Sequence, residues 1–501
     1  MRKLLGWIAA AGDRVNPIAV KEFRQAVRSR LVVAVLMLFL LVNLLILGGY
    51  LLRSPEIATS MEGGRSVFVL LLTVLLVTCL GFVPLYAGVR LSLERNDANL
   101  DLLYVTTLPG GAMVRGKYLT AMALTLLIFS ACMPFVVFTY LLRGIDLPTI
   151  FYVLAVGFLV CALANAMGIF AGCIPGSWFL RGLVGLGMLF ILVYTVGAML
   201  SWIYFALSYG ALGMTGGWEF WATFGTLTLI ELLGIGLLQV MSVALVSPKA
   251  SNRMLVPRIY VMGCWAVSGV VMALWSGYVK YDGPVATWTV AFGVLFSLLA
   301  VLALGERDTW NRRVRRAIPH NPLLRLLTFL LYTGSAGGLA WATLMFAATL
   351  YVAFVLTGST GGWSSGRPDA PWTDLTIFFG YVLCYCLTTA FLRTVLLRNL
   401  PTATLPVVAL MLVAALSLGP YLIAFFFAGS SFWRYDSGVC LLGSPMILTV
   451  WPGSDVEGLI APFVAGWTLL GLVGSVRWFA GQWRRFVPYR AAGGDQEGHP
   501  A

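Results

Sequence analysis

The chain has 501 residues, of which 60 % are hydrophobic and only 11 % charged; its net charge is +13 and its mean hydropathy is +0.90. Soluble domains are about 25 % charged, so a chain this long could not hide so much apolar surface from water, and this excludes a soluble enzyme, a secreted disulfide-stabilised protein and a disordered regulator. The composition predicts an all-α, polytopic transmembrane helical bundle, and in such proteins excess Lys and Arg are typical of cytoplasmic loops rather than of nucleic-acid binding.

The N-terminal segment, residues 1–30, is expected to stay on the cytoplasmic side. Its first apolar run, Leu4–Ala11, is short for a signal sequence and a second basic cluster follows it. Residues 18–30 then predict an amphipathic helix in the membrane interface, with an apolar arc of about 120° and a separate basic arc that faces lipid headgroups. The residues assigned to this interfacial helix are Lys21, Phe23, Arg24, Val27 and Arg28.

Apolar segments of about 20 residues, the length that crosses a bilayer, predict twelve spans. They are residues 31–52, 66–89, 118–142, 148–172, 182–205, 219–246, 259–277, 284–304, 326–356, 373–392, 403–428 and 458–476. With both termini cytoplasmic, 27 of the 33 Lys and Arg residues lie on the cytoplasmic side; the other six are Arg53, Arg65, Arg143, Lys280, Arg367 and Arg434. This asymmetry favours the twelve-span topology, because one missed span in the middle would reverse every later loop.

The loop at residues 90–117 carries the most distinctive polar pattern. A helix over 91–104 would place three carboxylates on one stripe beside an apolar stripe, and the segment Thr106–Gly111 would break that helix. This pattern favours a docking site for a soluble partner, with a solvated face as the alternative. The candidate residues of the loop are Glu94, Arg95, Asp97, Leu100, Asp101, Leu103, Tyr104 and Pro109.

The same loop contains the spacing of a phosphate-binding loop, from Gly111 to Gly116-Lys117. Tyr118 follows, where magnesium coordination requires Ser or Thr, and no strand precedes the glycines. We therefore expect this chain to bind no nucleotide and to have no ATPase activity of its own.

Few polar groups occur inside the predicted spans. Glu231, with Gln239 two turns further on and Asn165 in another span, forms a possible intramembrane polar site; a structural hydrogen bond between helices is the alternative. Ala164, Gly168 and Gly172 recur every four residues and predict close helix packing. The cysteines lie mainly in apolar segments and the chain has only two histidines, so we predict neither a disulfide framework nor a metal site.

Two groups of residues resemble the permease subunits of type-2 ABC exporters. Asn16-Pro17-Ile18, Lys21-Glu22-Phe23-Arg24-Gln25 and Arg28-Ser29-Arg30 resemble the connecting helix before the first span of that family. Glu94-Arg95, Leu100-Asp101-Leu102-Leu103, Thr107-Leu108-Pro109 and Gly116-Lys117 look like its coupling region. The chain departs from the family at Ala98-Asn99, where Gly-Thr is frequent, and in having twelve spans rather than six.

The resemblance implies a multi-pass subunit of the cell (inner) membrane that works as a homo- or heterodimer of permeases. ATP would be bound by a separate ABC ATPase subunit that contacts the coupling loop. The expected organisation is an N-terminal helix (1–30), a six-span permease-like core (31–246), a cytoplasmic linker (247–258), a further six-span region (259–476) and a cytoplasmic tail (477–501). Two alternatives stay open: a secondary transporter that uses Glu231, and a non-transporting membrane scaffold.

Overall fold

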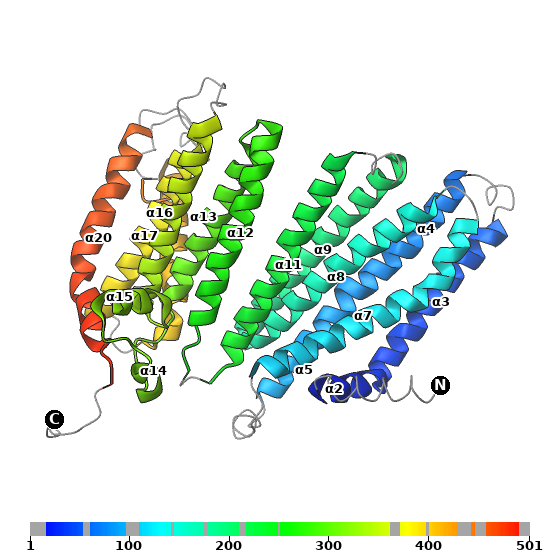
Figure 1. The fold of residues 1–501 in the computed structure, drawn as a ribbon, viewed down its shortest axis with the longest axis horizontal. Helices are drawn as coiled ribbons and strands as arrows, with labels where there is room; N and C mark the ends of the chain where they lie inside the picture. Colours follow the sequence, from blue (N-terminus) through cyan, green and yellow to red (C-terminus); the bar gives the residue numbers. More distant parts are fainter. Residues whose placement is uncertain are drawn as a thin grey trace. The chain divides into compact units, whose positions relative to one another are not determined.

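The computed structural model describes residues 17–53, 61–96, 110–141, 145–174, 178–209, 217–248, 251–360, 371–396, 400–428, 442–445 and 457–489. Over these residues the regular structure is helical throughout, without a strand, which confirms the predicted all-α membrane bundle (Figure 1). The chain forms two compact units, Met1–Pro248 (unit 1) and Lys249–Ala501 (unit 2). The boundary between them falls within the predicted linker at 247–258.

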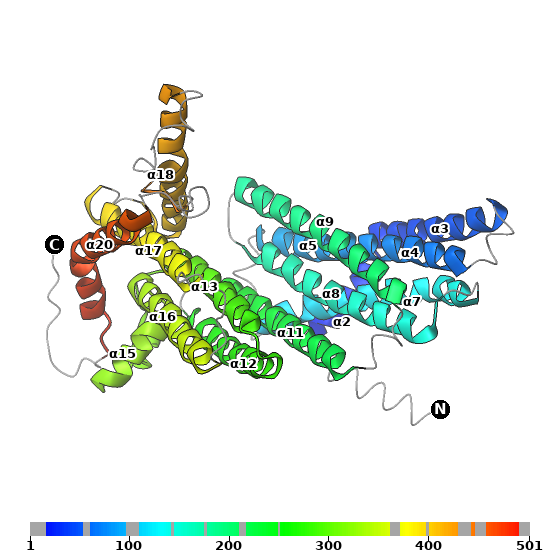
Figure 2. The same cartoon turned by 90° about the horizontal axis from the view of Figure 1, so that it is seen from above.

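Unit 1 consists of long helices that run side by side, with the short α2 behind them in the view of Figure 2. They are α2 (Pro17–Val27), α3 (Arg30–Arg53), α4 (Met61–Val77), α5 (Val83–Asn96), α7 (Gly110–Leu141), α8 (Leu147–Cys173), α9 (Trp178–Tyr209) and α11 (Trp218–Val246). A π-helical turn, η2 (Thr78–Phe82), joins α4 to α5, so the predicted span at 66–89 is part of one longer helix. Its fully buried leucines, Leu72, Leu75 and Leu76, lie in the core of this unit.

The predicted break at Thr106–Gly111 is wrong at its C-terminal end, because Gly110 and Gly111 already lie in the first turn of α7. Both glycines face the end of α11. A Cβ atom on Gly110 would lie 3.7 Å from Val246, and one on Gly111 would lie 3.9 Å from Val243. Packing between α7 and α11 therefore accounts for a helical turn that two glycines disfavour in isolation.

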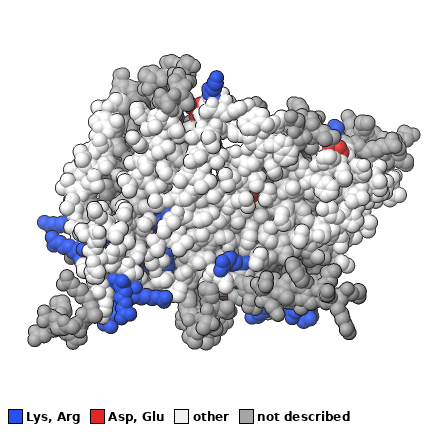
Figure 3. Space-filling model, viewed as in Figure 1, with Lys and Arg blue, Asp and Glu red and all other residues white. Residues whose placement is uncertain are grey.

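Unit 2 combines long helices with two short ones. The helices are α12 (Leu255–Val279), α13 (Gly283–Ala303), α14 (Arg312–Arg316), α15 (Pro322–Leu331), α16 (Ser335–Thr360), α17 (Pro371–Val395), η3 (Thr402–Thr404), α18 (Leu405–Ala428) and α20 (Glu457–Arg485). At the end that carries α14, Lys and Arg side chains gather, while the middle of the helices is almost free of them (Figure 3).

The span predicted at 326–356 begins too early: the structure divides this stretch into α15 and α16, separated by residues 332–334, and the candidate span starts at Ser335. Here Trp310 donates its indole N–H to the carbonyl oxygen of Thr333 at 2.7 Å, and Asn252 accepts hydrogen bonds from the Thr333 backbone and hydroxyl. Tertiary hydrogen bonds thus pair the backbone groups of Thr333 between the two helices. The apolar sequence alone gives no reason for the helix to be interrupted there.

Within the described residues, eleven helices are long and apolar enough to cross a membrane. They correspond to the predicted spans except 403–428. That segment is α18, whose apolar run over the described residues extends from Leu405 to Leu416. The chain is therefore a multi-pass helical membrane protein, and the count of twelve spans with cytoplasmic termini stays a prediction.

Candidate functional site

Three helices of unit 1 meet around a buried lysine. Lys117 of α7 is only 4 % exposed, and its ammonium group lies 3.2 Å from a carboxylate oxygen of Glu22 in α2. A second ion pair, of 2.7 Å, joins it to Glu94 at the end of α5. Glu22 is 12 % exposed and Glu94 is 38 % exposed, so this cluster reaches from the interior of the unit to its surface. We call these three residues the Lys117 cluster.

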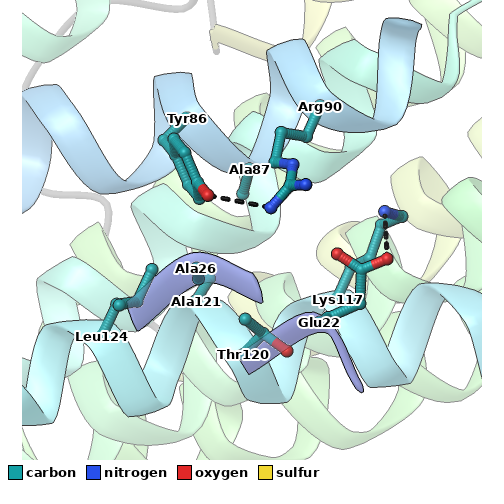
Figure 4. Close-up of a pocket in the computed structure, with 9 residues that line it drawn as sticks. All are labelled: Glu22, Ala26, Tyr86, Ala87, Arg90, Lys117, Thr120, Ala121 and Leu124. Carbon is teal, nitrogen blue, oxygen red and sulfur yellow. Dashed lines mark hydrogen bonds and ion pairs between the residues drawn. The ribbon is translucent and has the colours of Figure 1, made fainter. Parts of the chain in front are cut away.

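A second cation, Arg90, lies beside the Lys117 cluster. Arg90 of α5 donates a hydrogen bond to the Tyr86 hydroxyl at 2.9 Å and one to Gln25 of α2 at 3.5 Å. Lys117 is the cation that pairs with both Glu22 and Glu94, which is the compensation that charged groups need when they leave water. Glu22, Tyr86, Arg90 and Lys117 are among the residues that line a cavity of about 20 Å³, room for about one water molecule (Figure 4).

The interfacial helix predicted at 18–30 is present as α2, but its apolar side does not face lipid. Ala19 and Ala26 are buried, Phe23 packs against the core, and Thr120 of α7 donates a hydrogen bond to the carbonyl oxygen of Ala19 at 3.3 Å. This side prefers α7 because small residues allow two helices to approach closely. On the remaining surface of α2, Lys21, Arg24, Gln25 and Val27 are exposed, and Arg28, just after the end of the helix, is exposed too.

Only the beginning of the predicted docking stripe can be located. Glu94 contacts Lys117 within its own chain, so its carboxylate is not the free surface charge that the stripe implied. Arg95 belongs to α5, but its side chain lies outside the described residues, as do Asp97, Leu100, Asp101, Leu103, Tyr104 and Pro109. Gly111–Lys117, which has phosphate-loop spacing, is part of the α7 helix rather than a loop.

The intramembrane polar residues lie on α8 and α11, which pack against each other and against α7. Asn165 is fully buried and donates to the Thr125 hydroxyl of α7 at 2.9 Å, which fits the structural alternative for this residue. Over the described chain, however, no hydrogen-bond partner is present for Asn165 Oδ1, Glu231 Oε1 or the two polar side-chain atoms of Gln239. Buried polar atoms that lack a hydrogen-bond partner are costly unless a ligand, a proton or water satisfies them.

The small-residue stripe on α8 is confirmed as a close contact with α5. A Cβ atom built on Gly88 would lie 2.5 Å from the carbonyl oxygen of Gly168, and one on Gly172 would lie 2.5 Å from that of Gly88. Backbone therefore touches backbone, and α8 fixes the position of α5, the helix that carries Glu94. The seven cysteines in the described residues are buried and free.

Comparison of the chain with protein-family models, with curated proteins and with solved structures gives no match. Over the described residues, no group of three or more His, Cys, Asp or Glu side chains is arranged to hold a metal ion.

Sequence analysis named Glu22 only within the segment that resembles a connecting helix. It named Lys117 only at the end of the phosphate-loop spacing and of the segment that resembles a coupling region. A signal for Glu22 was present, because at 100° per residue it lies directly beside the arc of Ala19 and Ala26 that the structure buries. A carboxylate next to a buried helical face requires a cationic partner. That this partner is Lys117, 95 residues further along the chain, follows only from the packing of α2 on α7.

Proposed function

We propose that this chain is the membrane-spanning permease subunit of an ATP-driven exporter whose ATPase is a separate polypeptide. The observation that carries the proposal is the Lys117 cluster. The two sequence segments that resemble type-2 ABC exporter permeases are distant in the chain, yet Lys117 ties α2 to both helices that flank residues 97–109.

The cluster offers a physical route for coupling. A force applied to 97–109 by a docked ATPase would act on the end of α5 and the start of α7. Because the Lys117 cluster joins both to α2, and α5 contacts the backbone of α8, the helices would move together. A bundle with two arrangements of such helices can alternate its access from one side of the membrane to the other.

The test is purification of the tagged chain from its native membrane, followed by identification of the copurifying ATPase and measurement of its hydrolysis. Asp97→Lys with Asp101→Lys is expected to lower ATPase copurification at least about tenfold, because charge reversal opposes docking. Glu22→Gln is expected to keep the ATPase bound but to reduce transport per ATP hydrolysed, since α2 loses its ion pair while Lys117 keeps Glu94.

The matched control for charge reversal is Lys280→Glu with Arg367→Glu, on the side predicted to face away from the ATPase; this variant should copurify the ATPase normally. Absence of any ATPase from the wild-type preparation would contradict the exporter, as would full copurification with coupled hydrolysis in the Asp97/Asp101 variant.

Secondary transport is the second candidate function, and the unpartnered buried oxygen of Glu231 favours it. A carboxyl group on a membrane helix can carry a proton or bind a substrate.

If Glu231 has that role, Glu231→Gln should abolish proton-driven uptake into proteoliposomes while protein yield and thermal stability stay unchanged, because glutamine has nearly the same volume but does not ionise. Asn165→Asp is the control variant on α8, the helix that packs against α11. It adds a carboxyl group there and leaves the carboxyl group of Glu231 in place. Unchanged transport by Glu231→Gln would exclude the role of Glu231, and a loss of folded protein would make this glutamate structural.

A further inference from the structure

The short helix α15 in unit 2 has two unlike sides. Arg325 and Phe329 face the end of α20: the Arg325 guanidinium donates to the carbonyl oxygens of Phe486 at 2.7 Å and of Trp483 at 2.9 Å. It also lies 4.5 Å from the centre of the Trp483 ring, and the Phe329 ring packs edge-on against both aromatic residues. One side of α15 is thus fixed to α20.

The opposite side of α15 is a row of leucines that no described residue covers. Leu323, Leu324, Leu326 and Leu327 are between 49 and 73 % exposed. At 100° per residue they fall within one arc of about 160°, on the side away from Arg325 and Phe329. Only residues 332–334 separate α15 from α16, a candidate membrane span that begins at Ser335, so α15 directly precedes one end of that span.

Exposed guanidinium groups occur on the helix that precedes α15 and at the end of α20, against which α15 packs. Helix α14, which precedes α15, exposes Arg312, Arg313 and Arg316, and Arg484 and Arg485 are exposed at the end of α20. The backbone N–H of Tyr489 donates to the carbonyl oxygen of Arg315 at 3.1 Å, which holds α14 next to the end of α20. Residues 309–331 and 458–489 contain no Asp or Glu, so no carboxylate in these segments neutralises the arginines.

We propose that α14 and α15 form a binding surface for anionic phospholipids. The four leucines of α15 enter the acyl-chain region beside α16, and Arg312, Arg313 and Arg316 bind the phosphate headgroups. A membrane leaflet is the occupant that fits both features, because it offers hydrocarbon and negative charge at the depth where the row of leucines ends and the arginines begin. The surface is distinct from the Lys117 cluster and does not depend on an ATPase.

A local fluorescent label tests the surface. In a Cys440→Ser background, Leu326→Cys is labelled with an environment-sensitive dye, and the chain is placed in nanodiscs that contain phospholipids brominated on the acyl chain. Brominated phosphatidylglycerol is expected to quench the label at least about threefold more strongly than the same fraction of brominated phosphatidylcholine, because headgroup charge enriches it beside the arginines. Replacing Arg312, Arg313 and Arg316 with Gln should remove this preference without removing quenching by phosphatidylcholine.

Leu344→Cys supplies the matched control, since Leu344 is 56 % exposed in the middle of α16, far along the span from any headgroup. Its label should be quenched equally by both lipids. If the Leu326 label is quenched by neither lipid, α15 faces water or a protein partner and the proposal is wrong. Equal quenching of the Leu326 label by both lipids, or a preference that survives the triple arginine variant, would equally overturn an anionic-lipid site.

Discussion

Replacing Arg258 with methionine is expected to lower the free energy of unfolding of unit 2 by about 3–5 kcal/mol, because the substitution leaves a buried carboxylate without its cation. Arg258 is 4 % exposed, and its guanidinium lies 2.5 and 2.6 Å from the two oxygens of Glu306. The same group donates to the carbonyl oxygens of Leu330 and Tyr332, each at 2.7 Å. One side chain therefore joins α12, the segment after α13 and the break between α15 and α16.

Thermal or denaturant unfolding in detergent micelles measures this effect. Arg258→Met combined with Glu306→Gln should be less destabilised than Arg258→Met alone, because the double variant buries no unpaired charge. The amide oxygen introduced by Glu306→Gln can still accept the hydrogen bond that the Gly334 N–H donates at 2.8 Å. Arg312→Met, an exposed arginine of α14, should change stability by less than about 0.5 kcal/mol. The interpretation fails if Arg258→Met unfolds like the wild type, or if the double variant is no better than the single one.

The break that Arg258 stabilises also shows why part of unit 2 could not be read from the sequence. The apolar run at 326–356 is long enough for one span, so hydropathy predicts a single helix. Local signals do mark the ends of the two helices, namely Asn321-Pro322 before α15 and Gly334-Ser335 before α16. They are decisive only because Arg258 and Asn252, distant in sequence, bind the backbone between these ends.

The candidate site, too, could be predicted from the sequence only in part. Sequence patterns located the α2 segment, because amphipathic periodicity is a local property, whereas the ends of the predicted loop at 90–117 belong to α5 and α7. They could not show that the apolar side of α2 packs on α7, since lipid and a neighbouring helix both satisfy an apolar face. The assignment of Glu94 to a docking stripe had the same weakness. Periodicity places its carboxylate on a helix face, but it cannot show that Lys117 of another helix contacts that carboxylate.

The contact between α5 and α8 should be intolerant of even one additional methyl group. Gly168→Ala is expected to destabilise unit 1 by about 3 kcal/mol, the upper part of the usual range for overpacking. The new Cβ atom would lie against the carbonyl group of Pro84, with the carbonyl carbon 2.8 Å away. Because backbone cannot rotate aside as a side chain does, α5 must move away from α8, and Glu94 would move with it.

Gly197→Ala is the matched control for this substitution. Gly197 lies inside α9, and no atom is within 4 Å of a Cβ built on it. Alanine there should be neutral or slightly stabilising, since Ala has a higher helix propensity than Gly by up to about 1 kcal/mol. Unfolding of both variants in the same micelles separates the steric effect from the propensity effect. If Gly168→Ala matched Gly197→Ala in stability, α5 would not be held against α8 by backbone contact, and movement of 97–109 would not reach the bundle through that contact.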